Sequence, residues 1–325
     1  MALVRTRELW TFNRLWRGLA NLAVGVTVGL AMVLAMALVG LGRPAPATAT
    51  TEMPYGRGLL WQVDGAGPAP SYVFGTMHSA DEEVTDLAPP VADALADARS
   101  LSIEVVMTPQ AQASLALSMT LSDGRTLEDV VGPDLFDRAV AAGQPYGFGE
   151  RELRLFKPWA IMTLFSLPPS EVERQAAGAK ALDNRLQEAA DRRGLPVYGL
   201  EQIEEQIALF NDMAEADQIA MLDATIAQSD QVEATFEKMR QAYLAQDTAG
   251  IFEFMQAQQT GFDPDLVETF TASLLDARNE RMVERMAPRL AEGGAFVAVG
   301  ALHLPGENGV LKRLEDQGYQ VTRLY

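Results

Sequence analysis

Short apolar runs, each followed by turn-forming residues, predict β-strands near both ends of this chain. They read GLLWQVDG, SYVFGTMH, LSIEVVM, LPVYGLE, AFVAVGALH and QVTRLY, at residues 58–65, 71–78, 101–107, 195–201, 295–303 and 320–325. The turn-rich AGPAP after the first run predicts that the first two strands are neighbours, as in a hairpin with a longer loop.

Helical spacing of apolar residues dominates the sequence between these strands. Residues 89–100 begin with two prolines and place Val91, Leu95 and Ala98 at helical spacing. Further helices are predicted at 151–167 with an interruption at Pro158, at 180–194, through most of 201–259, at 263–294 and at 308–319. The strand–strand–helix–strand opening and the large helical middle region predict an α/β (α+β) fold, with a mixed β-sheet flanked by helices.

The first 50 residues have a different pattern, a basic segment followed by a long apolar one. Residues 1–17 carry four arginines and one glutamate, and the 25 residues of 18–42 carry no charge. Such a run can span a bilayer as a helix, and arginines before it keep the N-terminus cytoplasmic and export the rest. Two A-x-A patterns after residue 44 suit signal peptidase, so a cleaved signal peptide and a retained membrane anchor both stay open. We therefore expect two parts, residues 1–50 as signal or anchor with its linker, and 51–325 as a periplasmic domain.

Composition excludes several classes of function. The net charge is −18, and the predicted exported part holds 21 basic and 43 acidic residues, so no nucleic acid partner is expected. The absence of cysteine excludes disulfides, thiolate metal sites and cysteine nucleophiles. No G-x-S-x-G, P-loop or H-E-x-x-H motif is present.

Both histidines of the chain follow a strand in the same G-x-x-H arrangement. His78 ends SYVFGTMH and His303 ends AFVAVGALH. Ligands of open α/β sheets bind outside the carboxyl ends of strands, and a glycine there is expected to let the backbone turn sharply. Two copies of one arrangement, using every histidine, indicate a site and hint at an old duplication.

Glu104 is the candidate third member of that site. It stands between Ile103 and Val105 in an apolar run, and burying an unpaired carboxylate would be very costly. Two neutral imidazoles and a carboxylate are a common ligand set for a divalent metal with open coordination positions. Because histidine must be neutral to bind a metal, activity is expected to fall below about pH 6.

Other polar residues give weaker signals. Residues 81–83, an Asp-Glu-Glu run just after His78, are candidates to hold its ring, although a solvated acidic loop is favoured. Arg278 and Asn279 lie in a predicted helix, where the pattern alone favours a surface pair and an oxyanion donor is the alternative.

Over about residues 56–325 the chain resembles the TraB/GumN family, whose animal relatives are the Tiki metalloproteases. The resemblance rests on SYVFGTMH, LSIEVVM, KPWA at 157–160, LDNRLQEAADRRGLPVYGLEQIEEQ from 182, LLDARNERM from 274 and AFVAVGALHLPGENGVLKRLEDQGYQV from 295. In Tiki-like proteins the two G-x-x-H histidines and a glutamate form a divalent-metal site for peptide hydrolysis.

Carried over to this sequence, the resemblance implies particular residues and a fold. The metal ligands would be His78, Glu104 and His303, the catalytic residues Glu104, Arg278 and Asn279, and the family's aspartate before its central helix Asp183. The implied fold is a mixed sheet flanked by helices and built as two related halves.

The function expected from these features is a metal-dependent hydrolase, a peptidase, of the bacterial envelope. Its cofactor would be Mn, Co or Zn, and its partners a peptide or protein substrate and, through the N-terminal apolar segment, the membrane. Two alternatives stay open, a non-catalytic haem- or metal-binding protein and an accessory factor in polysaccharide export. A buried Glu104 within coordination range of both histidines would favour hydrolysis.

Overall fold

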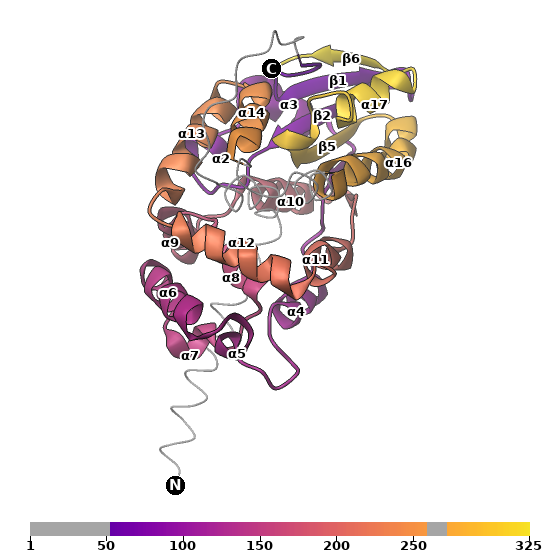
Figure 1. The fold of residues 1–325 in the computed structure, drawn as a ribbon. Coiled ribbons are helices and arrows are strands. Elements are labelled where there is room, and N and C mark those ends of the chain that lie inside the picture. Colours follow the sequence, from indigo (N-terminus) through magenta and orange to yellow (C-terminus); the bar gives the residue numbers. More distant parts are fainter. Residues whose placement is uncertain (1–52, 259–271) are drawn as a thin grey trace.

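A six-stranded mixed β-sheet organises the part of the chain that the computed structural model describes, residues 53–258 and 272–325. Its strands are β1 (Leu60–Asp64), β2 (Ser71–Thr76), β3 (Ser100–Ile103), β4 (Val197–Gly199), β5 (Ala295–Gly300) and β6 (Gln320–Arg323). Their order in the sheet is β4-β3-β5-β2-β1-β6. Figure 1 labels four of them, β5, β2, β1 and β6, at the end of the molecule where the chain ends. β1 runs antiparallel to β2 and β6, while β2, β5, β3 and β4 are parallel neighbours. The predicted mixed α/β sheet and the β1–β2 hairpin are confirmed.

The helices that precede β4, an edge strand of the sheet, are short. They are α2 (Glu82–Thr85), α3 (Pro89–Asp97), α4 (Pro109–Ser118), α5 (Leu127–Val131), α6 (Pro133–Gly143), α7 (Glu150–Leu153), α8 (Pro158–Phe165), α9 (Pro169–Ala176) and α10 (Leu182–Arg193), with a 3-10 turn at η1 (Gln144–Tyr146). Proline occupies the first turn of five of them, α3, α4, α6, α8 and α9, where its missing N–H removes no helical hydrogen bond. The interruption predicted at Pro158 is therefore a helix start.

The helices after β4 include the long α16, which closes one face of the sheet. They are α11 (Ile203–Asn211), α12 (Glu215–Ala227), α13 (Val232–Leu244), α14 (Thr248–Gln258), the π-helical turn η2 (Ala272–Asp276), α16 (Ala277–Glu292), the 3-10 turn η3 (Ala301–His303) and α17 (Val310–Asp316). The helical stretch predicted over 201–259 is thus divided into four helices. The predicted helix start at residue 263 lies outside the described residues.

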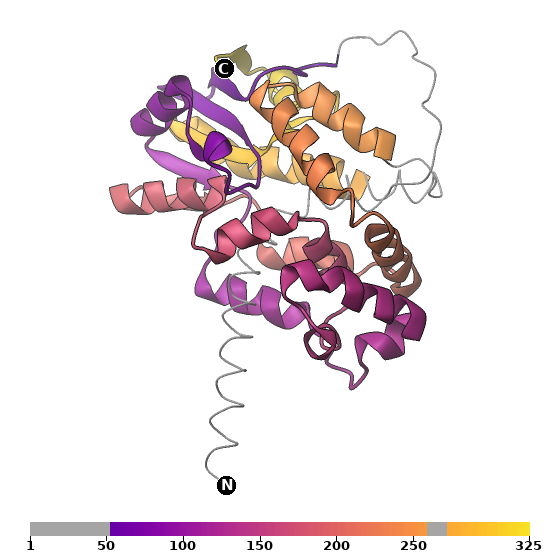
Figure 2. The same cartoon turned by 90° about the vertical axis from the view of Figure 1, so that its left-hand side faces the viewer.

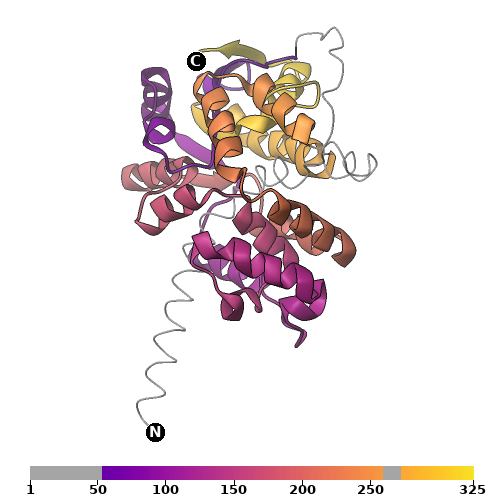
Figure 3. The same ribbon diagram turned by 60° about the vertical axis from the view of Figure 1, so that its left-hand side comes forward.

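Two apolar clusters cover the two faces of the sheet. On one face Val297 and Val299 of β5 pack with Met282 and Met286 of α16 and with residues of α17. On the other face the alternate strand residues, such as Phe296, join the larger core that includes α3, α10 and the helical middle region. Figures 2 and 3 show helices α4–α8 gathered at the end of the molecule away from β6. Because residues along a strand alternate between the two faces of the sheet, Val297 and Val299 face α16 and Phe296 faces away from it.

The N-terminal segment predicted to be a signal or anchor, residues 18–42, lies outside the described residues. In the stretches 53–258 and 272–325, no helix has both the length and the apolar character that crossing a bilayer requires. The division at residue 50 and the relation between two halves stay predictions.

Candidate functional site

Three parallel neighbours, β3, β5 and β2, end at one edge of the sheet, and the candidate site residues follow them. Thr76 at the end of β2 lies opposite Gly300 at the end of β5. Glu104 directly follows β3, His303 lies in η3 after β5, and His78 lies just beyond β2. Their relative exposures are 4%, 0% and 2%. The topology therefore gathers three buried polar side chains at the carboxyl ends of the strands, where α/β sheets bind ligands.

The glycines of the two G-x-x-H motifs, Gly75 and Gly300, leave room for close packing and do not make a backbone turn. Neither Gly75 nor Gly300 has a positive φ, so the expected sharp turn is not their role. A Cβ on Gly75 would lie 2.6 Å from Leu304 Cδ1, and one on Gly300 would lie 3.2 Å from Glu104 Oε1. The first glycine lets the loop after β5 approach β2, and the second lets Glu104 reach the backbone.

The ring of His303 is held by Asn279, whose own orientation is fixed by a carbonyl group. Asn279 Nδ2 donates to the backbone oxygen of Asn308 at 2.9 Å, and Asn279 Oδ1 lies 2.6 Å from His303 Nδ1. Because a carbonyl oxygen can only accept, the amide nitrogen must face Asn308 and the amide oxygen must face the ring. His303 Nδ1 therefore carries the proton, and Nε2 carries a lone pair.

The ring of His78 is likewise held by a hydrogen bond at Nδ1, from a residue of α10. Asp183 Oδ2, at the start of α10, lies 3.0 Å from His78 Nδ1, and Asp183 Oδ1 accepts from the Thr76 hydroxyl at 2.7 Å. A carboxylate accepts hydrogen bonds, so His78 Nδ1 also carries the proton. The acidic residues 81–83 do not hold this ring, and Asp81 instead caps α2. Asp183, which only the family resemblance indicated, is the partner.

Both Nε2 atoms are buried and make no hydrogen bond. A buried acceptor without a donor is unfavourable, and a neutral imidazole whose Nδ1 is hydrogen-bonded is a common metal ligand. The chemistry of His78 and His303 therefore fits a divalent cation.

Glu104 lies beside His303. Its Oε1 accepts from the Gly300 N–H at 2.7 Å and is 3.8 Å from His303 Nε2. Two ligands that each lie about 2.1 Å from one ion are roughly 3–4 Å apart, so this spacing is compatible with a shared cation. His78 makes no hydrogen bond or ion pair with either residue, and no three His, Asp or Glu side chains in the described ranges form a ready metal-binding cluster. The structure thus brings two of the three predicted ligands into contact and places the third at the same edge of the sheet.

Arg278 is buried at the centre of an ion-pair network, so the prediction of a surface pair is wrong. Its relative exposure is 1%, and Nη2 lies 2.7 Å from both Glu104 Oε2 and Glu201 Oε2. Its Nε also donates to Glu201, and its Nη1 donates to the Leu274 carbonyl. These contacts direct the guanidinium at protein acceptors and make it the charge partner of Glu104.

Burial keeps His303 neutral. Burial is the largest cause that lowers the pKa of His303, the positive charge of Arg278 adds to it, and the charge of Glu201 opposes both, which leaves a pKa of about 3. Burial also lowers the pKa of Arg278, but the carboxylates of Glu104 and Glu201 outweigh this and raise it overall. Protonation of His303 is therefore not a cause of the fall in activity expected below about pH 6.

Glu201 and Gln206 belong to this network, and the sequence analysis missed them. Glu201 is 2% exposed, and Gln206 Nε2 donates to it at 3.0 Å and to Glu104 Oε2 at 3.5 Å. The signal that could have found Glu201 is its position, since it lies just after β4 as Glu104 lies just after β3. Gln206 has no such signal within its helix.

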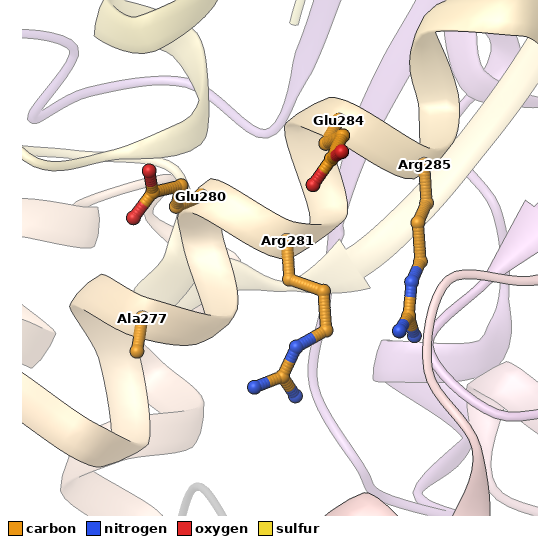
Figure 4. A pocket seen from close by; sticks show the side chains of 5 residues that line it. All are labelled: Ala277, Glu280, Arg281, Glu284 and Arg285. Carbon is orange, nitrogen blue, oxygen red and sulfur yellow. The ribbon is translucent and has the colours of Figure 1, made fainter.

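The ion pairs around Arg278 and Glu201 continue through Arg281 to an open pocket on α16. Arg281 Nη1 lies 3.3 Å from Glu201 Oε1, and Arg285 donates to both oxygens of Glu205. The pocket encloses about 600 Å³ and is lined by Ala277, Glu280, Arg281, Glu284 and Arg285 (Figure 4). Its arginines are already paired with glutamates, so this surface supports the network.

Comparison with known proteins finds a family that matches most of the chain. The TraB/PrgY/gumN family matches residues 59–323. Metalloprotease TIKI1 of Danio rerio is 25% identical over 86% of this chain and 66% of its own length. Metalloprotease TIKI2 of Xenopus tropicalis is 28% identical over 81% of this chain and 59% of its own length, and TIKI1 of Homo sapiens is 26% identical over 86% and 65%.

The chain spans less than two thirds of the length of these relatives. No solved structure matches it. Because the family match extends over most of the sequence and includes both histidine motifs, this protein belongs to the TraB/PrgY/gumN family.

Proposed function

We propose that this protein is a metal-dependent peptidase that holds a divalent cation with His78, His303 and Glu104. The observation that carries the proposal is the pair of buried Nε2 atoms, which make no hydrogen bond although each ring is held by a hydrogen bond at Nδ1. The names of the relatives, metalloproteases, support the same chemistry.

The side chains around the site have distinct roles in this proposal. A divalent cation, when bound, would polarise the carbonyl of a peptide and lower the pKa of a water. Asp183 and Asn279 keep the two imidazoles in the tautomer that can bind it. Arg278 balances the charge of Glu104.

This assignment changes the predicted role of Arg278 and Asn279. An oxyanion donor must point at the reacting atoms. Arg278 points at two carboxylates and a carbonyl, and Asn279 points at His303 and Asn308. We therefore assign both residues to positioning the site.

The remaining parts of the proposal rest on the sequence. The cation would be Mn²⁺, Co²⁺ or Zn²⁺, and the substrate a peptide or protein of the bacterial envelope. The arginines before the uncharged run of residues 18–42 support export to the periplasm, with the apolar segment either cleaved as a signal peptide or kept as a membrane anchor.

A peptidase assay on the purified full-length protein tests the function. We expect hydrolysis of quenched fluorescent peptides that a chelator abolishes and that Mn²⁺, Co²⁺ or Zn²⁺ restores. His78→Ala and His303→Ala should lose metal and activity together, while Glu173→Ala, on an exposed position of α9, should keep both. Hydrolysis that survives chelation would contradict the proposal, and stoichiometric metal without hydrolysis would favour the non-catalytic binding protein.

A further inference from the structure

A second buried carboxylate, Glu171 of α9, lies outside the site and contacts the loop that follows His78. Its side chain is fully buried. Glu171 Oε1 accepts from the Ala80 N–H at 2.6 Å, and Oε2 accepts from the Ser79 hydroxyl at 3.0 Å. Arg174 and Gln175 of the same helix donate to the other sides of the carboxylate. The hydrogen bonds that the carboxylate accepts from outside its own helix therefore come from the two residues after His78.

The loop is held from the opposite direction by the next helix. The Leu182 N–H donates to the Ser79 carbonyl at 3.0 Å, and the neighbouring Asp183 holds the ring of His78. Glu171 and Asp183 belong to one continuous segment, α9 and α10, although the loop lies about a hundred positions earlier in the chain. This segment fixes both the backbone after His78 and the His78 ring.

Burying a carboxylate costs free energy that an apolar residue at this position would avoid. The cost is offset by hydrogen bonds that hold residues 79 and 80, where the buried backbone N–H of Ala80 needs an acceptor. We propose that Glu171 is a positioning residue, which fixes this loop so that His78 presents Nε2 to the cation. The part that concerns the cation rests on the proposed function, whereas the effect on the His78 ring does not.

The proposal assigns the effect to the acceptor geometry of Glu171 rather than to its charge. In Glu171→Gln the amide oxygen can still accept from the Ala80 N–H, and the amide nitrogen can donate to the Ser79 hydroxyl oxygen. The partly exposed Arg174 loses its acceptor there and turns to solvent. In Glu171→Met both acceptors are lost at similar volume. The matched control is Glu173→Met, because Glu173 is exposed on the same helix.

The test uses the full-length protein and Zn²⁺ alone as the probe. Since the chain has two histidines, imidazole ¹⁵N spectra contain signals of only two rings. Glu171→Met should shift the His78 signals, leave the His303 signals in place and weaken Zn²⁺ binding by roughly 10–100-fold, as losses of residues that orient metal ligands do. Glu171→Gln should restore the His78 signals and most of the affinity, and Glu173→Met should match the wild type.

Unchanged His78 signals and Zn²⁺ affinity in folded Glu171→Met would overturn the inference, as would a Glu171→Gln variant as impaired as Glu171→Met. If Glu171→Met does not fold, Ser79→Ala decides, because it removes one contact to Glu171 and should shift the His78 signals and weaken binding by a smaller factor. No change in Ser79→Ala would then reject the inference. A wild type that binds none of Zn²⁺, Mn²⁺ and Co²⁺ would reject the proposed function, while a His78 shift in Glu171→Met that is absent from Glu173→Met would still support the positioning role.

Discussion

His303 Nδ1 lies 2.6 Å from Asn279 Oδ1, and this contact decides which ring nitrogen faces the candidate site. His78 has the same relationship with Asp183. One partner is an amide from α16 and the other a carboxylate from α10, so different chemistry produces the same tautomer. Both rings are left with a buried Nε2 atom that makes no hydrogen bond.

Asn279→Leu should weaken Zn²⁺ binding by roughly 10–100-fold, because the His303 ring loses the acceptor that fixes its tautomer. Isothermal titration with Zn²⁺ measures the change. Asn308→Ala is the control, since Asn279 uses only the backbone carbonyl of Asn308. Equal affinities for Asn279→Leu and wild type would remove Asn279 from the site.

Arg278→Met should lower the free energy of unfolding by roughly 3–5 kcal/mol, because it leaves Glu104 and Glu201 buried with fewer opposite charges. Arg281→Met should cost only about 1 kcal/mol or less, because the Arg281 side chain is one-third exposed. Urea denaturation of both variants measures the difference. A fully stable Arg278→Met that lost only turnover would instead support an oxyanion role.

Stability of the metal-free protein should fall as the pH drops below about 6.5. The pKa of His303 is about 3 in the folded protein, while an unfolded histidine titrates near 6.5. As the pH falls, His303 therefore takes up a proton in the unfolded chain before it does so in the folded protein. The stability that the neutral His303 contributes above pH 6.5 is lost progressively toward pH 3.

For His303 the loss would be roughly 3 kcal/mol between pH 6.5 and pH 4, at about 1.4 kcal/mol per pH unit. His303→Gln should remove this part of the pH dependence, as measured by urea unfolding at a series of pH values. Parallel curves for the variant and the wild type would show that His303 does not titrate in this way.

Gly75→Ala should destabilise the fold by roughly 1–3 kcal/mol, because its Cβ would overlap Leu304. Thermal unfolding measures the loss. If the overlap is the cause, the loss should be smaller when the same change is made in a Leu304→Ala background. Full additivity of the two substitutions would place the strain elsewhere.

The periodicity of the sequence predicted the sheet better than the helices. Strands with clear apolar runs, such as residues 71–76 and 295–300, appear where expected. The region 201–259 is nearly all helix-forming, so propensity alone does not show where α11 ends and α12 begins. Those breaks depend on tertiary packing, which a local pattern does not contain.

The site residues could likewise be predicted only where a local sequence pattern marks them. His78, His303 and Glu104 could be proposed because they follow apolar strands, and strand ends meet at one edge of a sheet. Arg278 resembles a surface residue in sequence because its partners, Glu104 and Glu201, are far away in the chain. Glu171 gives no signal at all, since its role depends on a contact between α9 and a loop some ninety positions earlier.

The most direct test of the account is a Zn²⁺ titration of the full-length protein followed by imidazole ¹⁵N spectra of its two histidines. We predict that the Nε2 signals of His78 and His303 shift together and saturate at one ion per chain, while both Nδ1 atoms stay protonated. A shift of one histidine alone, or of neither, would contradict the proposal that both rings bind one cation.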